Sequence, residues 1–489
     1  MQYSTLKRKT LSGLFWSFSG LIINQGAQFI IQVFLARLLF PADFGVIGMI
    51  AVFISVSQTL IDSGFASALI REKEPSQEDL STVFYFNLIM SCAAYIILFF
   101  ASNEISLFFR VPKLVPILRV VTIVFVINSF GIIQETMLTK NLNFKLQTKI
   151  NILSSVISGA ISIIMAFGGM GVWSLVGRTV FFQLIKTMLL CSFMRWSPSL
   201  VFNFETFKRF YNFGWKLMVS GLISSVYQNI YSIIIGRQFS PSQLGYYTNA
   251  QKLNDTACQS ITVSVQKVSY PVLSSLRDDH DKLKHSYRKI IKSSVFITFP
   301  MLFGLAAAAQ PLIMVIFGEK WINSILYFQI ICFAGALYPL HAINLSILEV
   351  KGRSDLFLRL EIVKKFIAFA FIGTAIYLKL GILGLLWAGV INSYTVYFIN
   401  SYYSAELLSY PAAAQIKDIA SIYIAAVVMA LIVYTVGYFL TVGFLLKLII
   451  QIVVGIVLYV LLCRLLKINE LNEAFDIIKY VFKKIKGYK

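Results

Sequence analysis

Four cationic side chains lie inside long apolar segments, where a charge is costly, and they are the first candidates for chemistry: Arg178, Lys186, Lys216 and Lys252. An ionisable residue at membrane depth is by default a pointer to a substrate or ion pathway. Arg178 and Lys186 are eight residues apart, which corresponds to about 12 Å along a helix and to broadly one side of it. Cations placed in this way could form a ladder of charge that holds an anionic ligand.

Each of these cations also has an ordinary structural explanation. Lys252 is three residues before Asp255, so the two could form a local pair on one helix face, and Asp255 is therefore a candidate alongside it. Lys186 and Lys216 could extend their ammonium groups to the cytoplasmic interface and do nothing more. Both explanations remain open at this stage.

Side-chain amides accompany the cations in two of the apolar segments. The first segment carries Gln25, Gln28 and Gln32, and a later one carries Gln228 and Asn229. An amide that faces lipid is expensive, so these faces must turn toward protein or water. Hydrogen bonding between helices explains any single amide, but their paired placement in two segments favours a polar central cavity.

Other reactive residues indicate no cofactor or metal. The five cysteines are scattered, the three histidines form no ligand cluster, and no phosphate-cradling G-x-x-x-x-G-K-[ST] motif is present. Asp62, near the inner end of its segment, is expected to pair with a cytoplasmic cation rather than to carry a coupling ion. A coupling proton or sodium ion elsewhere is left open.

The elements that position these residues are predicted to be membrane-spanning helices. The chain is 58% hydrophobic and 13% charged, against roughly a quarter charged in a soluble domain. Runs of about 20 apolar residues are long enough to cross a bilayer, and in lipid they must be helical. The sequence therefore predicts an all-α polytopic membrane protein with about 14 spans: 12–38, 42–66, 80–102, 112–134, 148–167, 171–195, 209–236, 243–270, 290–309, 322–347, 355–378, 382–408, 416–440 and 442–463.

The distribution of Lys and Arg predicts the orientation. With the N-terminus in the cytoplasm, most of the 43 basic residues fall in cytoplasmic loops. The outer side keeps few: Arg37, Arg110, Lys113, Arg119, Arg237, Lys320, Lys379 and Lys447. This bias accounts for most of the net charge of +21 through contact with anionic membrane lipids, and no nucleic-acid partner is expected. Both termini are predicted to be cytoplasmic.

An internal repeat predicts two related halves. Arg37-x-x-x-Pro41-x-x-Phe44-Gly45 recurs as Arg237-x-x-x-Pro241-x-x-Leu244-Gly245, and Gln28 aligns with Gln228 at the same offset. Because each half holds six spans, the halves are parallel repeats with a substrate site expected at their interface. The predicted divisions are a six-helix lobe at 1–202, a second at 203–410, two extra helices at 411–465, and at 466–489 an amphipathic tail on the cytoplasmic membrane surface.

Several short motifs along the chain resemble the Wzx-type polysaccharide flippases, whose superfamily also contains the MATE multidrug antiporters and the lipid II flippases. These motifs are Lys7-Arg8-Lys9 before Gly13-Leu-Phe-Trp16, Ala36-Arg-Leu-Leu-Phe-Pro41-Ala-Asp-Phe-Gly45, Asp62-Ser-Gly-Phe65, Ala68-Leu-Ile-Arg71, Leu142-Asn-Phe144, Leu244-Gly-Tyr-Tyr247, Tyr270-Pro-Val-Leu-Ser274 and Gly318-Glu-Lys-Trp321. The resemblance implies a monomeric carrier of the bacterial inner membrane. It would flip undecaprenyl-pyrophosphate-linked oligosaccharide units of O-antigen, capsule or exopolysaccharide to the outer leaflet by alternating access. Polysaccharide polymerase machinery is an implied partner.

Three other functions are compatible with a polytopic membrane protein, and each would need different residues or substrates. A MATE-type antiporter handles cations and would favour acidic groups at depth, which the four candidate cations oppose. The substrate of a lipid II flippase differs from the proposed one in the head group alone. Only the closer resemblance to the Wzx-type flippases argues against this function. A membrane-embedded polymerase or ligase would need a sizeable outer loop for its catalytic groups, and the longest outer loop here is short. The chain is therefore predicted not to be an enzyme.

Overall fold

The computed structural model describes residue 20 and residues 23–486, and this part of the chain is helical without a β-strand. Nine of its helices are long and apolar enough to cross a membrane, or up to eleven if each of two bent pairs counts as one span. The all-α membrane fold is thus confirmed, and the count of fourteen spans stays a prediction. The motifs Lys7-Arg8-Lys9 and Gly13-Leu-Phe-Trp16 lie outside the described residues.

Each expected span overlaps one helix or a run of helices separated by short breaks. After a first helix over 23–38, the order is α2 (Pro41–Asp62), α3 (Phe65–Arg71), α4 (Gln77–Phe109), α5 (Leu114–Val121), α6 (Ile123–Ser129), α7 (Ile132–Lys140), α8 (Phe144–Phe167), α9 (Val172–Met194), α10 (Phe204–Gln228), α11 (Ile230–Gln238), α12 (Pro241–Ser275), α13 (His280–Ala307), α14 (Ala309–Ile316), η1 (Glu319–Trp321), α15 (Ser324–Gly335), α16 (Tyr338–Val350), α17 (Ser354–Tyr377), α18 (Gly381–Leu408), α19 (Ala412–Phe439), α20 (Phe444–Leu465) and α21 (Asn469–Lys486).

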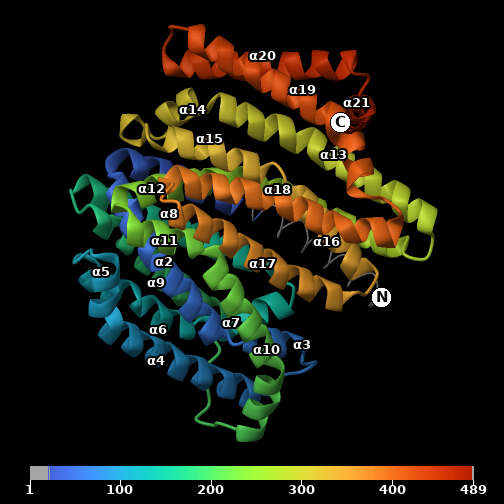
Figure 1. Ribbon diagram of the computed structural model, residues 1–489. Coiled ribbons are helices and arrows are strands. Elements are labelled where there is room, and N and C mark those ends of the chain that lie inside the picture. The colour runs from blue at the N-terminus through green and yellow to red at the C-terminus, as the bar shows by residue number, and fades with distance from the viewer. Residues whose placement is uncertain (1–19, 21–22, 487–489) are drawn as a thin grey trace. The chain divides into compact units, whose positions relative to one another are not determined.

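The helices form two compact units, which divide within α12 between Thr248 and Asn249 (Figure 1, blue to green and green to red). The first unit contains the helices from 23 to the start of α12. The second contains the rest of α12 and all later helices. The predicted boundaries at 203, 411 and 466 remain predictions.

The second span is broken where α2 gives way to α3. Ser63 and Gly64 both adopt the left-handed conformation, with φ of 42° and 74°, and glycine reaches such a conformation without strain. Helix α10 packs closely at this break: a Cβ on Gly64 would lie 2.8 Å from the Cα of Gly214. The two glycines therefore allow α2 and α10 to meet backbone to backbone.

The two copies of the repeat occupy equivalent positions in the first unit. Helix α2 begins at Pro41 and α12 begins at Pro241, a first-turn position that proline suits because its missing N–H has no partner there anyway. Asp43 accepts a hydrogen bond from the backbone N–H of Phe40 at 3.0 Å. Gln243 accepts one from Ser240 at 3.3 Å in the corresponding place.

The beginnings of α2 and α12 also cross each other through the repeated glycines. A Cβ on Gly45 would lie 1.8 Å from the carbonyl oxygen of Pro241, and a Cβ on Gly245 would lie 1.8 Å from that of Pro41. A contact this close leaves no room for any side chain at either glycine. The two turns therefore lie at the same end of the first unit, which confirms that part of the repeat prediction.

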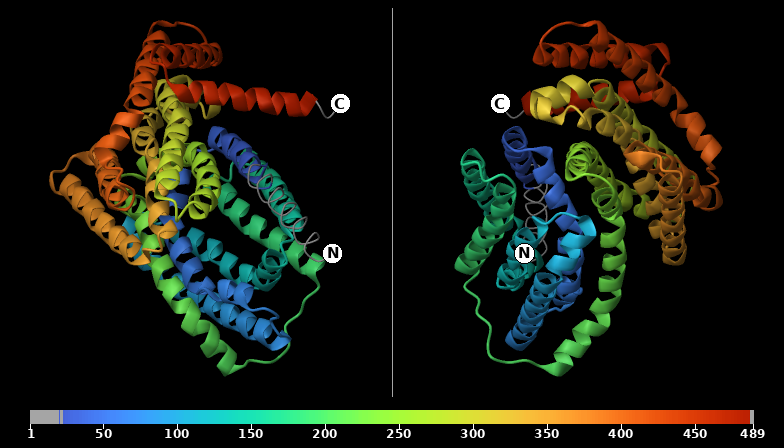
Figure 2. Two further views of the ribbon diagram at one scale, coloured as in Figure 1. Left: turned by 90° about the vertical axis from the view of Figure 1, so that its right-hand side faces the viewer. Right: turned by 60° about the vertical axis from the view of Figure 1, so that its left-hand side comes forward.

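In the second unit, the C-terminal helix is fastened to α13 by ion pairs. Lys289 lies 2.9 Å from Glu473 and Lys292 lies 2.9 Å from Glu470; Figure 2 shows α21 as the red helix that ends near C. The tail is thus helical as predicted. Most of its side chains from residue 477 onward are outside the described part, so its contact with the membrane surface stays a prediction.

Candidate functional site: a polar cavity in the first unit

A cavity of about 520 Å³ opens between α2, α3, α6, α7, α8 and α9. Its lining is mostly polar: Gln58, Asp62, Gly64, Ala66, Ser67, Ile70, Asn128, Ile132, Glu135, Thr136, Thr139, Gln147, Gln183 and Lys186. All of these helices have an apolar composition suited to lipid, so amides, hydroxyls and charges gathered on one inner surface point to an aqueous or ligand-binding space.

The cavity contains two carboxylates and one ammonium group. Lys186 Nζ lies 2.8 Å from each carboxylate oxygen of Glu135. Asp62 instead accepts a hydrogen bond from the amide of Gln58 at 3.5 Å. The prediction that Asp62 pairs with a cytoplasmic cation is therefore wrong for the described residues. Of the two explanations left open for Lys186, the structure shows neither an interface contact nor a ligand: the side chain is only slightly exposed and binds Glu135 among the described residues.

Amide and hydroxyl groups extend the polar surface away from this ion pair. Gln183 Nε2 donates to Asn128 Oδ1 at 2.8 Å and to Thr187 Oγ1 at 3.1 Å. The Thr187 hydroxyl in turn donates to the carbonyl of Ile127 at 3.1 Å. The bonds to Asn128 and Ile127 join α9 to α6, so the wall of the cavity is held by side chains with fixed orientations.

Sequence reasoning missed Glu135 and Gln183. The span that holds Glu135 was predicted to end at residue 134, and the acid was therefore assigned to a loop. In the structure this span bends by 51° between Leu114–Ser129 and Ile132–Lys140. The bent half, α7, carries Glu135 back toward α9. Glu135 lies between two other polar residues, Gln134 and Thr136, and this short polar run gave no periodic signal for that bend.

Arg178 lies on α9 and points toward the first helix. Its Nη2 donates to the backbone carbonyl of Gln28 at 3.4 Å. One turn earlier on the first helix, Asn24 accepts a hydrogen bond from Ser155 of α8 at 2.9 Å. The side of this helix that carries the amides therefore faces α8 and α9 in part. This is the arrangement expected if the amides serve hydrogen bonding between helices. Gln25 and Gln32 are half-buried.

The candidates on α10 lie near a second break. Asn229 separates α10 from α11, where the helix bends by 42°, and it donates to the carbonyl of Ser225 at 2.8 Å. Gln228 and Lys216 are exposed. The ammonium of Lys216 lies 6.0 Å from the ring centroid of Trp215, so its closest described contact is local.

Lys252 and Asp255 belong to the second unit. Asp255 is half-buried and accepts a hydrogen bond from Gln251 at 2.8 Å, while Lys252 is exposed and interacts with it electrostatically. The structure therefore gathers Lys186, Glu135 and Asp62 into one cavity, Arg178 against Gln28, and Lys252 beside Asp255. The substrate-binding role of all ten sequence candidates stays a prediction.

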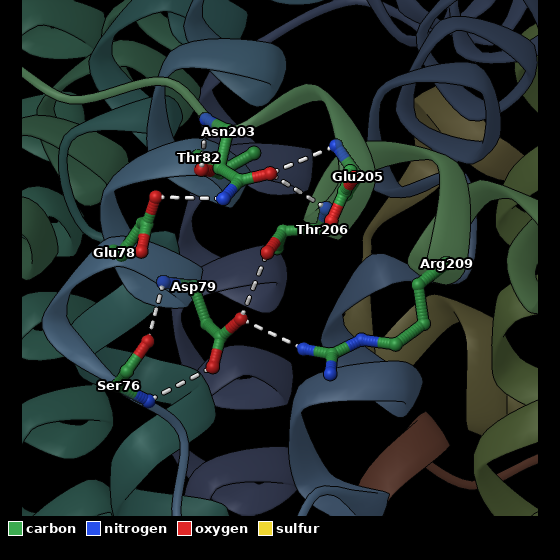
Figure 3. Close-up of polar contacts among 8 residues, drawn as sticks. All are labelled: Ser76, Glu78, Asp79, Thr82, Asn203, Glu205, Thr206 and Arg209. Atoms are coloured by element: carbon green, nitrogen blue, oxygen red, sulfur yellow. Dashed lines mark hydrogen bonds and ion pairs between the residues drawn. The ribbon is translucent and has the colours of Figure 1, made fainter.

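A separate polar cluster holds the beginnings of α4 and α10 together (Figure 3). Asp79 accepts from the backbone N–H of Ser76 at 2.9 Å, from Arg209 at 2.8 Å and from the Thr206 hydroxyl at 3.2 Å. Asn203 caps α10 and donates to Glu78 at 2.7 Å. The segment 195–203 that precedes α10 runs as an extended coil (Figure 2), so these bonds determine where α10 begins.

We expect Asp79→Ala to lower the free energy of unfolding by about 2–4 kcal/mol. The change removes an N-terminal helix cap, worth about 1 kcal/mol, and a charge-assisted bond to Arg209 worth about 1.5–3 kcal/mol. Thermal unfolding of the purified protein in detergent measures the loss. Glu78→Ala is the matched control, because its partner Asn203 is bound at an exposed site and a change there should stay within about 0.5 kcal/mol. Equal losses in the two variants would contradict the assignment.

The family model described as "Polysaccharide biosynthesis protein" matches residues 34–326, which is more than half of the chain. The chain belongs to this family. Curated relatives include the teichuronic acid biosynthesis protein TuaB of Bacillus subtilis (strain 168), 29% identical over 61% of this chain and 62% of that protein. The lipopolysaccharide biosynthesis protein WzxC of Escherichia coli (strain K12) is 26% identical over 81% of each chain. The alignment with TuaB thus spans about three fifths of that relative.

Two solved structures share the fold of this chain although their sequence identity to it is low. The lipid II flippase MurJ, in an inward closed conformation, matches with a TM-score of 0.74 at 16% identity and covers 92% of this chain and 98% of its own. An inward-facing multidrug MATE transporter matches with a TM-score of 0.59 at 16% identity, over 80% of this chain and 98% of its own. The family match and relatives such as WzxC confirm the resemblance to the Wzx-type flippases, and the solved structures show the shared fold.

Proposed function

We propose that this protein flips undecaprenyl-pyrophosphate-linked oligosaccharide units from the cytoplasmic to the outer leaflet of the inner membrane by alternating access. The observation that carries the proposal is a guanidinium, Arg178, within an apolar helix of a chain that has the fold of a lipid flippase over most of its length. Membership of a polysaccharide biosynthesis family and relatives such as WzxC and the succinoglycan transport protein ExoT support the oligosaccharide cargo.

Physical chemistry supports the same cargo. A pyrophosphate and a chain of sugars cannot cross hydrocarbon unaided, so the carrier must offer cations and hydrogen-bonding groups at membrane depth. Arg178, Lys216 and Lys252 offer the cations, whereas Lys186 would first have to leave Glu135. The amides of the first helix and of α10 offer the hydrogen bonds. The protein acts in this proposal as a carrier of its substrate and makes or breaks no covalent bond.

A flipping assay in proteoliposomes tests the function directly. Purified protein is reconstituted with a fluorescently labelled undecaprenyl-pyrophosphate oligosaccharide, and the fraction that a membrane-impermeant reductant quenches is followed with time. Protein-dependent appearance of label in the opposite leaflet is the expected result. Flipping of lipid II with equal efficiency would widen the range of substrates. Transport of a cationic dye without flipping of either lipid would contradict the proposal and indicate drug export instead.

The proposal also includes both termini in the cytoplasm, as the Lys and Arg bias predicts. We expect a cysteine placed at Asp281, whose side chain is fully exposed at the start of α13, to react with a membrane-impermeant maleimide only after the cells are opened. A cysteine at the exposed Lys113 should react in intact cells. Both variants are made in a background without the five native cysteines. The reverse pattern of labelling would invert the topology.

A further inference from the structure

The charges in the cavity of the first unit do not balance. Lys186 is bound to both oxygens of Glu135 at 2.8 Å, which leaves the second carboxylate, Asp62, with the neutral amide of Gln58 at 3.5 Å. Of the residues that line the cavity, only these three are charged. Two acids and one base carry one uncompensated negative charge, and one added positive charge would neutralise it.

Such an imbalance matters because the site is enclosed by membrane helices. Two carboxylates that share one cation do not ionise independently, and the proton or cation that relieves the imbalance belongs to the group as a whole. Since the ion pair occupies Glu135, Asp62 is the acid with a free binding capacity. Its existing amide partner can stay in place, because Gln58 can hydrogen-bond a protonated or an ionised carboxyl group equally through the same side chain.

Protons can reach Asp62 through the cavity. Its volume of about 520 Å³ exceeds by far the roughly 30 Å³ that one water molecule occupies in the liquid. Thr139 and Gln147 add further hydrogen-bonding groups to the lining. An aqueous space bordered by donors and acceptors allows a proton to move from solution to the carboxyl group and back.

Asp62 is also the last residue of α2, directly before the break between α2 and α3. The two left-handed residues that follow it, Ser63 and Gly64, end the helix. Helix α10 contacts this break through uncharged groups: Gly214 approaches Gly64, and Met218 Sδ lies 3.4 Å from Ser63 Oγ. The charged groups that interact with Asp62 are Glu135 of α7 and Lys186 of α9. A change of its charge therefore acts where α2, α3 and α10 meet.

The geometry points to Asp62 as a proton-binding residue that couples transport to pH: it takes a proton from water in the cavity onto its carboxylate, releases the same proton later, and thereby alters the contact of α10 with the α2–α3 break. The coupling to transport rests on the proposed flippase function. The binding of the proton does not, so the two parts can be tested separately.

The first test needs no substrate. Infrared difference spectra of the purified protein are recorded between neutral and acidic pH, and the carbonyl absorption of protonated carboxyl groups is followed. We expect a titrating band that Asp62→Asn loses and Asp62→Glu retains. The Asn variant preserves the shape of the side chain and its amide contact, so the fold should survive. Asp278→Asn is the matched control, because Asp278 is an exposed carboxylate outside the cavity, and it should leave the band unchanged. A band that persists in Asp62→Asn would overturn the inference.

The second test measures coupling in proteoliposomes. A pH difference of one unit is a difference of about tenfold in proton concentration across the membrane. We expect the flipping rate of the wild type to rise by up to that factor. Asp62→Asn should flip at one rate with or without the gradient, whereas Asp278→Asn should respond like the wild type. Stimulation by a sodium gradient instead of a pH gradient, or a full pH response in Asp62→Asn, would refute proton coupling at this site. A wild type that flips nothing would defeat the proposed function and leave the infrared result to decide proton binding.

Discussion

Arg178→Gln is expected to reduce export of the lipid-linked oligosaccharide by about a hundredfold or more without loss of folded protein in the membrane. Arg178 lies on α9, and its guanidinium donates to one backbone carbonyl, that of Gln28. An arginine offers five donors in a planar fork that matches two phosphate oxygens at once. Each charge-assisted bond is worth about 1.5–3 kcal/mol, so two lost bonds to a pyrophosphate correspond to at least a hundredfold.

Conservative variants distinguish a binding role from a structural one. Arg178→Lys keeps the charge but loses the fork, so export should fall only partly. The double variant Lys252→Gln with Asp255→Asn removes a second candidate cation together with the acid beside it, which avoids leaving that acid unpaired. Complementation of a flippase-deficient strain, with membrane levels measured in parallel, reports both. Full export by Arg178→Gln would reduce Arg178 to a support for the first helix.

A disulfide between α2 and α10 is expected to stop flipping completely and reversibly. The hydroxyl oxygens of Thr59 and Ser225 lie 2.8 Å apart, so cysteines at these positions would place their sulfur atoms within reach of a bond. Both helices belong to the first compact unit, but the division at residue 203 that the internal repeat predicts assigns α2 to the first half of the chain and α10 to the second. Alternating access requires the two halves to move against each other, and a covalent link between them prevents that movement.

The measurement compares oxidised and reduced protein in the background without native cysteines. Flipping by Thr59→Cys with Ser225→Cys should vanish on oxidation and return with a reductant. Ser81→Cys with Ser199→Cys is the matched control, since these hydroxyls are 2.9 Å apart and both belong to the first half. Its disulfide should leave flipping intact. Undiminished flipping by the locked α2–α10 pair would mean that these helices move as one body.

The helical fold was predictable because hydropathy along the chain is enough to locate apolar helices. The repeat was predictable because proline and glycine record local backbone geometry: Pro41 and Pro241 do begin helices, and Gly45 and Gly245 do meet a neighbouring backbone. The crossing of these two glycines could not be predicted, since identical motifs need not touch. The break at Ser63 and Gly64 was also hidden, because two left-handed residues leave the apolar pattern unchanged.

The cavity was far less predictable than the fold. Lys186 and Glu135 are 51 residues apart and on different helices, so their pairing depends on how α7 and α9 pack and not on any spacing in the sequence. The substrate-binding role of Lys186 stays a prediction, and its partner Glu135 was not foreseeable from the sequence. The position of Asp62 near basic loops predicted a pairing with a cytoplasmic cation. In the structure its carboxylate instead binds Gln58 and lines the cavity.

The cluster around Asp79 has a consequence for biosynthesis. Asp79 receives its cation from Arg209, which follows 130 residues later in the chain. At about 5–20 residues per second, a ribosome needs roughly 7–26 s to add that stretch. For most of this interval, once Phe109 has been added, α4 is complete while the carboxylate at its beginning has no Arg209 guanidinium to bind. The N-terminal helices therefore gain this contact with α10 only after the first 208 residues have been made.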